Sequence, residues 1–503
     1  MLEKIVGDAQ VIAVICNQWG DSGKGKFSDY FAQHWADIIA RGTGGNNAGH
    51  TSVINGQERI FHLIPAGIFY DSIGKINVLG NGMVIDPEVL CKELSALDAE
   101  GLTYDNLIIS KEAHVIMPHE IAKDRAKNVS LKKGSIGSTG RGIGPTYTDK
   151  TARFGVMIRD LYDQDSLVKK LNKAQDEYPE IEIDIDETIA YLKPFAEKIK
   201  PFVRNTYIEM QRFVRDGKKI LVEGAQGLLL SIEHGTNPFV TSSDASRHGT
   251  LSGVGLSGAD LVFGIVKFPF MTRVGGGPFP TEIGGADSEA YCAKGLDHDV
   301  FYETSHYLNA PIDLVRIRSL QKKDGIEGLS TSEREELVGY EKQTIDYIKS
   351  HREEVVGLIN SNDLLTRGVG IRLAAFEYGA TTKRPRRIGW TDAVAAKYAV
   401  GINGPLMILT KPDSVGGLDE FSLCYGYETD GTVTENFDRD PKVLYNVKPV
   451  NTPYQGYGDI SDVRMYDKLP DSLTKAINEF EKFTNGHVAI VSVGPEAEQT
   501  IIR

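Results

Sequence analysis

A short apolar segment near the start of the chain runs directly into a glycine-rich loop. Residues 11–16 read VIAVIC, a continuously apolar run that is typical of a buried parallel strand. GDSGKGK follows at residues 20–26, and residues 27–35 space their aromatic side chains as a helix packed on a sheet would. Strand, loop and helix in this order predict an α/β fold.

Further short apolar runs separated by helical patterns extend this fold class. We expect strands at residues 76–79, 107–110, 219–222, 261–266, 406–409 and 488–493, and helices at residues 86–99, 165–174, 189–214 and 392–400. Their alternation predicts a mainly parallel central sheet with flanking helices and a P-loop-like nucleotide-binding architecture.

The chain has 503 residues without an internal repeat, and we expect a single α/β domain over residues 1–503. Within it we expect a helical subdomain at residues 165–214 that covers the site. Residues 284–376 are rich in Glu, Lys and Asp, and we expect an acidic insertion there, on the outside of the core.

Charge and cysteine usage narrow the kinds of ligand. The formal net charge of −13 argues against a protein that coats nucleic acid or an anionic membrane, whereas a local site for a small anion is compatible with it. The 4 cysteines form no CxxC pair, so neither a disulfide framework nor a zinc site is expected.

The sequence has no run of about 18 apolar residues that could span a bilayer. We therefore expect a cytoplasmic protein.

The loop at residues 20–26 fits the GxxxxGK part of a phosphate-binding loop, but Phe27 stands where a Ser or Thr would bind magnesium. Phosphate binding is still favoured, because the glycines expose backbone N–H groups and Lys24 and Lys26 add cations. Asp21 would then serve as a metal ligand or as a base. The alternative is a tight surface turn with solvated lysines.

Two further segments carry candidate chemistry. GGNNAGHT at residues 44–51 places His50 at the end of a flexible, amide-rich stretch, and histidine is easily tuned for proton transfer. TKPD at residues 410–413 follows an expected strand and is similar to the element with which G proteins read guanine, where the Asp413 carboxylate would accept two N–H groups. The alternatives are an ordinary hydrogen-bonded histidine and a polar strand exit.

Together with other motifs, these segments resemble the adenylosuccinate synthetase family. The matching motifs, in chain order, are NQWGDSGKGK at 17–26, NNAGHT at 46–51, STGRGIGP at 138–145, EGAQG at 223–227, HGT at 234–236 with TSS at 241–243, TRVG at 272–275 with GPFPTE at 277–282, GATT at 379–382 and GP at 494–495. Residues 284–376 and parts of the C-terminal third fall outside them.

The resemblance implies a GTP-dependent ligase of purine nucleotide biosynthesis. Such an enzyme joins L-aspartate to the 6-position of inosinate (IMP) through a 6-phosphoryl intermediate, with Mg²⁺ as cofactor. It implies that Asp21 takes the N1 proton of the purine and holds Mg²⁺ together with the Gly49 carbonyl. His50 would act as an acid, Lys24 would neutralise the transferred phosphoryl group, and Gln226 would orient the 6-oxygen.

The resemblance also implies binding residues for each substrate. For inosinate these are Asp21, Ser22, Gly23, Lys24, Asn47, Ala48, Gly49, His50, Thr139, Arg153, Gln226 and Thr241. For GTP they are Gly20, Gly23, Gly25, Lys26, Arg387, Lys411, Asp413, Ser492 and Gly494. For aspartate they are Thr381, Thr382, Arg384 and Arg387. Arg153 matches an arginine that the neighbouring subunit supplies, so we expect a homodimer.

Two departures from the family pattern keep an alternative open. Ser22 stands where a glutamate is usual, and Pro385 offers no N–H where the resemblance leads us to expect an arginine contact with the ribose. A viral-type relative that uses dGMP would tolerate both changes. A GTP-binding regulatory protein without ligase activity is a more remote alternative. It predicts loss of His50, Gln226 or the loop at 379–382, and none is lost.

Overall fold

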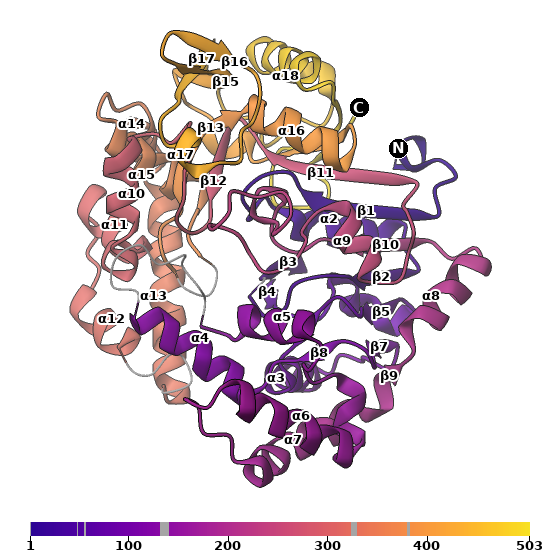
Figure 1. Cartoon of the computed structure of the whole chain (residues 1–503). Helices are drawn as coiled ribbons and strands as arrows, with labels where there is room; N and C mark the ends of the chain where they lie inside the picture. The colour runs from indigo at the N-terminus through magenta and orange to yellow at the C-terminus, as the bar shows by residue number, and fades with distance from the viewer. Residues whose placement is uncertain (1, 48, 55–56, 131–139, 323–328, 380–382) are drawn as a thin grey trace.

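A ten-stranded sheet forms the centre of the molecule (Figure 1). The computed structural model describes residues 2–47, 49–54, 57–130, 140–322, 329–379 and 383–503. The strand order is β19-β18-β14-β11-β1-β10-β2-β5-β7-β9, and each neighbouring pair is parallel except β18 with β19. The strands are β1 (Val11–Cys16), β2 (Ile38–Arg41), β5 (Ile76–Leu79), β7 (Leu107–Ser110), β9 (Val203–Arg204), β10 (Ile220–Glu223), β11 (Leu261–Lys267), β14 (Leu406–Thr410), β18 (His487–Ser492) and β19 (Thr500–Ile502).

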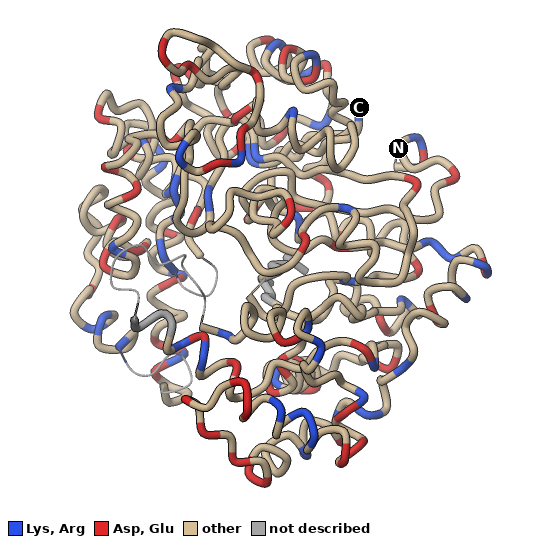
Figure 2. Tube along the Cα trace, in the orientation of Figure 1, with Lys and Arg blue, Asp and Glu red and all other residues tan. Residues whose placement is uncertain are grey.

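Helices cover both faces of this sheet. Successive side chains of β1 point to opposite faces, and each set packs against a different helix. Ile12 and Val14 pack with Phe27 and Phe31 of α2, whereas Ala13 packs in another cluster that includes Met210 and Phe213 of α8. The helices of this half are α1 (Leu2–Val6), α2 (Lys24–His34), α3 (Pro87–Ala99), α4 (Pro118–Ser130), α5 (Ile143–Ala152), α6 (Gln164–Glu177), α7 (Ile185–Ile199), α8 (Thr206–Arg215) and α9 (Arg247–Ser252). Charged residues lie mainly on the peripheral helices and loops (Figure 2).

Smaller sheets accompany the central one. The larger of them has five strands. Four follow the order β12-β13-β15-β16, and β17 pairs with β15 in antiparallel orientation. Its strands are β12 (Phe270–Arg273), β13 (Arg387–Asp392), β15 (Glu420–Thr429), β16 (Thr432–Thr434) and β17 (Lys448–Gln455). Two-stranded sheets pair β3 (His50–Ile54) with β4 (Gln57–Phe61), and β6 (Val84–Ile85) with β8 (His114–Val115).

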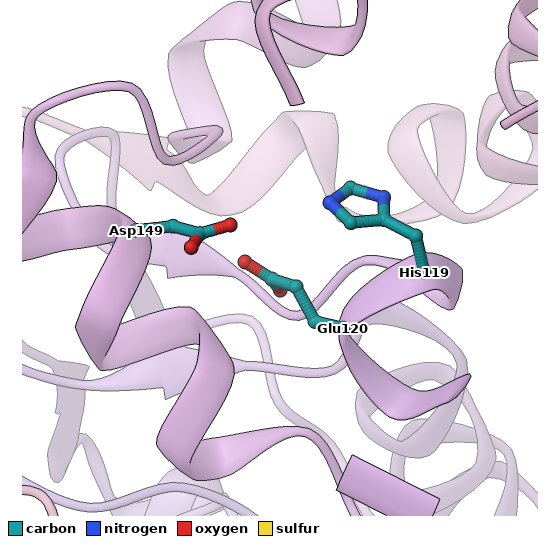
Figure 3. A group of neighbouring side chains, drawn as sticks. All are labelled: His119, Glu120 and Asp149. Atoms are coloured by element: carbon teal, nitrogen blue, oxygen red, sulfur yellow. The ribbon is translucent and has the colours of Figure 1, made fainter. Parts of the chain in front are cut away.

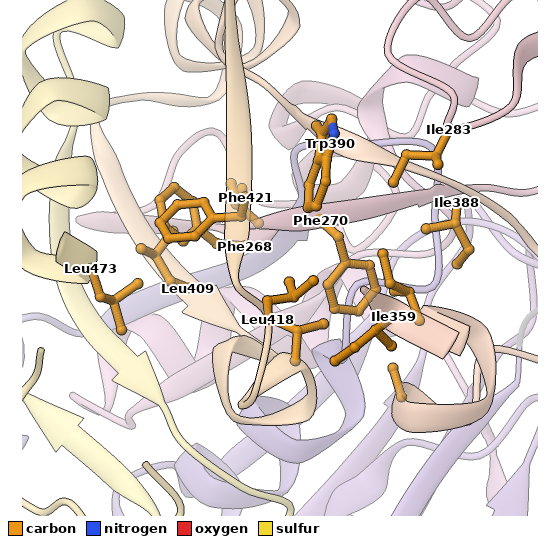
Figure 4. Packing of buried hydrophobic residues seen from close by; sticks show 14 of the residues in the cluster. Phe268, Phe270, Ile283, Ile359, Ile388, Trp390, Leu409, Leu418, Phe421 and Leu473 are labelled. Carbon is orange, nitrogen blue, oxygen red and sulfur yellow. The ribbon is translucent and has the colours of Figure 1, made fainter. Parts of the chain in front are cut away.

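The segment 284–376 is helical, but it does not lie outside the core. Its Phe301, Ile359 and Ile371 belong to the same buried cluster as Phe270 and Leu409. Figure 4 shows Ile359 in this cluster together with Phe270 and Leu409. Acidic residues such as Glu335, Glu353 and Glu354 are exposed on helices whose apolar side chains are buried, whereas Asp299 and Glu303 are themselves buried. The helices from here on are α10 (Gly285–Cys292), α11 (Val300–Tyr307), α12 (Leu314–Gln321), α13 (Thr331–Ser350), α14 (Arg352–Ile359), α15 (Leu364–Ala375), α16 (Ala393–Asn403), α17 (Pro441–Leu444) and α18 (Asp471–Thr484).

The single helix expected at residues 189–214 is wrong. Helix α7 ends at Ile199, the short strand β9 joins the edge of the central sheet, and α8 starts again at Thr206. Pro201 lacks the N–H that a continuing helix needs, and Asn205 caps α8 by accepting from the Ile208 N–H. Residues 165–214 therefore divide, because α6 and α7 pack beside α3 while α8 packs on the sheet.

Three glycines meet where β2, β5 and α9 end. A Cβ on Gly42 would collide with the Thr250 carbonyl oxygen, and a Cβ on Gly82 or Gly253 would collide with the Gly42 carbonyl oxygen. The Gly82 N–H donates to the Gly253 carbonyl at 2.9 Å. The three segments are therefore in direct backbone contact.

Among the helices of the described ranges, none has the length and apolar character needed to cross a bilayer.

Candidate active site

The loop between β1 and α2 is fixed at the carboxyl end of the central sheet. Asp21 has φ 45°, and Gly23 precedes α2 with φ 83°, a left-handed backbone that glycine adopts without a steric cost. Thr410 Oγ1, at the end of β14, donates to the Ser22 carbonyl at 2.8 Å. This bond joins the glycine-rich loop to the end of β14, where the TKPD segment begins.

A charged network starts at Asp21, and we use this name for Asp21, Arg386, Glu377 and Lys267. Asp21 Oδ2 lies 2.7 Å from Arg386 Nε, and the Asp21 side chain is 37% exposed. Arg386 Nη1 donates to Glu377 Oε2 at 2.6 Å, and Glu377 Oε1 lies 2.6 Å from Lys267 Nζ. Glu377 and Lys267 are both buried. The network thus runs from the edge of the site into the core.

The buried end of the charged network has displaced pKa values. Burial lowers the pKa of Lys267 to about 8, and Glu377 opposes that effect. Burial also acts to raise the pKa of Glu377, but Lys267 and Arg386 outweigh it and lower this pKa to about 2. Both groups are charged at neutral pH, so Arg386 is held beside Asp21 by a fixed carboxylate.

Lys24 and Gln226 are brought together from segments 202 positions apart. Lys24 Nζ donates to the Gln226 backbone carbonyl at 2.6 Å. Gln226 follows β10 with φ 50°, and both polar atoms of its side chain are buried without a hydrogen-bond partner among the described residues. A Cβ on Gly44 would lie 3.1 Å from Gln226 Oε1, so the chain approaches this amide closely.

Neighbouring positions after β2 share this property. Thr43 Oγ1 and Asn46 Oδ1 are buried and, like the Gln226 amide, have no partner within the described part of the chain, although Asn46 Nδ2 donates to Asp86 Oδ2 at 3.2 Å. We call Gln226, Thr43 and Asn46 the unpaired group. An unsatisfied buried polar atom costs about 1–3 kcal/mol, so a water molecule or a polar ligand is the expected partner.

The predicted GTP residues from both ends of the chain converge on Lys26. Its Nζ donates to Ser492 Oγ and to the Gly494 carbonyl at 2.8 Å each, and to the Gln499 carbonyl at 3.1 Å. Burial lowers the pKa of Lys26 to about 7, partly offset by the charge of Asp413. Lys26 therefore joins the start of α2 to the end of β18 through protein oxygens.

Asp413 and Lys411 lie at the end of β14. Lys411 has φ 69°, and its Nζ donates to the Ala375 carbonyl at 3.0 Å. Burial raises the pKa of Asp413, and Lys411 opposes this effect. TKPD therefore lies at the exit of β14 near Lys26, with Lys411 and Asp413 half-buried.

The two arginines predicted for the aspartate site occupy different surroundings. Arg387 is 5% exposed, its Nε lies 3.0 Å from Glu282 Oε1, and its Nη1 donates to the Gly277 carbonyl at 2.6 Å. Arg384 is exposed, and its side chain lies against Gly295. Arg387 is thus held by protein groups, and Arg384 faces solvent.

Sequence reasoning did not single out Arg386, the arginine that reaches Asp21. It directly precedes β13, which begins at Arg387, and successive side chains of an extended chain point to opposite sides. That alternation is the signal that separates the two adjacent arginines. Glu377 and Lys267 carried no motif, because their pairing joins residues far apart in the sequence.

The remaining predicted residues are placed separately. Asn47 Oδ1 accepts from the Gly45 N–H at 3.2 Å, and the Thr241 N–H donates to the Leu230 carbonyl at 2.7 Å. Arg153 ends α5 with φ 71° and is exposed. His50 pairs with Phe61 through its backbone, and its side chain is not described. Four predicted residues lie outside the described residues: Ala48, Thr139, Thr381 and Thr382.

These features define a nucleotide-binding α/β enzyme whose site lies at the carboxyl ends of parallel strands. A family model described as adenylosuccinate synthetase matches residues 13–501. The chain is 35% identical over 502 residues to adenylosuccinate synthetase of Clostridium perfringens, with 97% of each chain covered. The chain belongs to the adenylosuccinate synthetase family and is a GTP-dependent ligase.

Solved structures give the same result. Fully ligated adenylosuccinate synthetase from Plasmodium falciparum matches with a TM-score of 0.76 and 29% identity, covering 98% of this chain and 100% of that one. Cyanophage S-2L succinoaminodeoxyadenylate synthetase bound to dGMP and dATP matches with a TM-score of 0.50 and 17% identity, covering 98% and 95%. The predicted fold class is confirmed, and the dGMP alternative is not favoured.

Proposed function

We propose that this chain joins L-aspartate to the 6-position of inosinate while cleaving GTP, through a 6-phosphoryl intermediate. The observation that carries the proposal is the junction of Lys24 with Gln226 at 2.6 Å, beside a buried carboxamide that has no partner among the described residues. A purine 6-oxygen is a suitable partner for that amide. Lys24 supplies the positive charge that a phosphoryl group transferred to this oxygen requires.

Asp21 is the proposed base in this reaction. Its carboxylate projects from the same loop as Lys24 and is the exposed end of the charged network. Arg386 holds one carboxylate oxygen at 2.7 Å, which orients the side chain and leaves the other oxygen for the N1 proton of the purine. His50 lies in β3, which contacts α2, and is the proposed acid.

The residues present fit Mg²⁺. A partly exposed carboxylate on Asp21 and the backbone carbonyl of the exposed Gly49 are oxygen donors of the kind that Mg²⁺ prefers beside phosphate groups. When bound, the cation would supply charge neutralisation on the GTP phosphates. The protein's own part is to present both oxygens from the loops after β1 and before β3.

The guanine and phosphate side of the proposal rests on Lys26 and Asp413. Lys26 is fixed to Ser492 and Gly494, and its charge is coupled to that of Asp413. The Asp413 carboxylate would accept from the guanine base, and the first turn of α2 would meet the phosphates. Arg387 serves this site indirectly, by holding Glu282 and the Gly277 carbonyl.

The aspartate site and the dimer are further parts of the proposal. Arg384 is exposed next to Thr381 and Thr382, and a dicarboxylate requires such a fork-shaped donor. Arg153 is exposed at the end of α5, as expected of an arginine that enters the neighbouring subunit's site. We propose a homodimer in the cytoplasm on the strength of the family resemblance.

The test offers the purified protein L-aspartate and GTP with IMP, dGMP or GMP, and identifies the succinyl product by mass. We expect the adduct of IMP and a stoichiometric release of GDP. A dGMP adduct in place of it would favour the viral-type alternative. GTP hydrolysis that does not depend on aspartate, with no adduct, would support a regulatory GTP-binding protein and contradict the proposal.

A further inference from the structure

A buried cluster of one histidine and two carboxyl groups lies between α4 and α5, outside the groups assigned above. His119 and Glu120 are in the first turn of α4, and Asp149 is in the last turn of α5. One donor atom from each of the three side chains lies within 4.8 Å of the other two. Figure 3 shows the imidazole and both carboxyl groups turned toward the same space. We call these three residues the α4–α5 cluster.

The histidine of this cluster lacks the partner that a buried imidazole normally has. His119 is 6% exposed, and its Nδ1 is buried without a hydrogen bond to any described residue. By contrast, His298 is also buried, and its Nδ1 is 3.1 Å from the Tyr291 carbonyl oxygen. In Figure 3 the edge of the His119 ring that is farther from the backbone is turned toward the two carboxyl groups. A polar ligand in the cluster would use this ring.

The two carboxyl groups are held in place by donors from outside the cluster. Glu120 Oε2 accepts from Thr146 Oγ1 at 2.6 Å and from the Met117 N–H at 2.8 Å, and Asp149 accepts from the Tyr178 hydroxyl. Carboxylates that bind metals are typically oriented by such outer hydrogen bonds. The supporting shell is therefore already present.

The donor set selects the kind of ligand. An imidazole nitrogen with two carboxylate oxygens suits a divalent transition cation such as Zn²⁺, whose bonds to these atoms are about 2.0–2.2 Å long. Two carboxylates would balance its charge once the proton in the hydrogen bond between the Glu120 and Asp149 side chains is released. Lys123 is the nearby cation that opposes binding, and its Nζ is held 3.3 Å from the centre of the Tyr178 ring.

We propose that His119, Glu120 and Asp149 form a structural site for a divalent transition cation of the zinc class, which links the start of α4 to the end of α5. Arg153 follows Asp149 by one helical turn, and the N–H groups of Phe154 and Gly155 donate to the Asp149 carbonyl. The cation would therefore stiffen the segment that carries Arg153. The site is separate from the Mg²⁺ ligands proposed at Asp21.

The test measures Zn²⁺ binding to the full-length protein after chelator treatment, by calorimetry in excess Mg²⁺. We expect one equivalent to bind, and His119→Ala to weaken it at least about tenfold. The matched control is His114→Ala, because His114 is also buried with an unpartnered Nδ1 among the described residues but is outside the cluster. That control, and Asp21→Asn, should bind Zn²⁺ as the unmodified protein does.

Spectroscopy keeps the proposal testable if His119→Ala does not fold. X-ray absorption at the zinc edge of the unmodified protein should show one imidazole with oxygen ligands, and Glu120→Gln should weaken binding at least about tenfold as well. No bound equivalent, a sulfur-containing ligand set, or equal affinity in the His119 and His114 variants would overturn the proposal. So would loss of binding in Asp21→Asn alone.

Discussion

The charged network and the unpaired group lie at the same end of the central sheet but are built in opposite ways. In the charged network, Asp21, Arg386, Glu377 and Lys267 form ion pairs with separations of 2.6 to 2.7 Å. In the unpaired group, the Gln226 amide is buried without a described partner. The first is built from ion pairs between protein groups, whereas the second leaves buried polar atoms without a partner among the described residues.

This difference separates positioning from recognition. Removing one member of a buried ion pair leaves an uncompensated charge and weakens the fold. Removing a group that has no protein partner leaves the fold nearly unchanged and weakens only what it binds. Substitutions in the two groups should therefore differ in which quantity they change, folding stability or turnover.

The largest expected effect is on turnover in Asp21→Asn. The amide cannot take the purine proton, so kcat for the succinyl product should fall by about 10²–10⁴-fold. Steady-state assays with IMP, GTP and aspartate measure it. Asp216→Asn is the control, because Asp216 is exposed and 4.0 Å from Arg215. Activity within a few-fold of the unmodified protein in Asp21→Asn would remove Asp21 from the mechanism.

Glu377→Gln should have the next largest effect, on stability. It leaves the buried Lys267 without its carboxylate partner, while Arg386 keeps Asp21, so the free energy of unfolding should drop by about 3–5 kcal/mol. Urea unfolding measures it. Glu341→Gln is the control, since its partner Lys383 is partly exposed at 3.1 Å, and such pairs contribute about 0–1 kcal/mol. Equal losses in both variants would contradict the scaffold role of the charged network.

Gln226→Ala should reverse that pattern. Loss of a donor to the purine oxygen should lower kcat by about 10²–10³-fold, while the free energy of unfolding changes little. Gln18→Ala is the matched comparison, because its Nε2 donates to the Lys267 carbonyl at 3.1 Å and its Oε1 accepts from the Lys267 N–H at 2.9 Å. We expect Gln18→Ala to lower stability. A stability loss in Gln226→Ala as large as in Gln18→Ala would refute the distinction.

The last expected effect is a change in the pH dependence of stability in Lys26→Met. The pKa of Lys26 falls from 10.5 to about 7 on folding, so the unfolded chain binds this proton more tightly. The free energy of unfolding should therefore rise with pH between about 7 and 10, and Lys26→Met should flatten that rise. Urea unfolding across this range measures it, with the exposed Lys475→Met as control. Parallel curves for both variants would speak against the depressed pKa.

The strands of the central sheet were largely predictable, and the contacts of the charged network were not. Apolar runs marked β1, β5 and β7 at their observed bounds, because a strand buried on both faces leaves a local pattern. The pairing of Lys267 with Glu377 has no local pattern, since it depends on β11 meeting a segment more than 100 residues later. The contact of Arg386 with Asp21 could not be predicted for the same reason, because it depends on which side of the extended chain before β13 faces the loop after β1.

The backbone contact of Gly42, Gly82 and Gly253 limits how this protein can change over evolution. Any side chain at one of these positions would push apart segments that end three different elements, and no compensating substitution nearby could make room for it. Insertions between them would shift Thr43 and Asn46 at the same time. We therefore expect variation in this part of the protein to arise at other loops, and engineering should leave the contact of these three glycines unchanged.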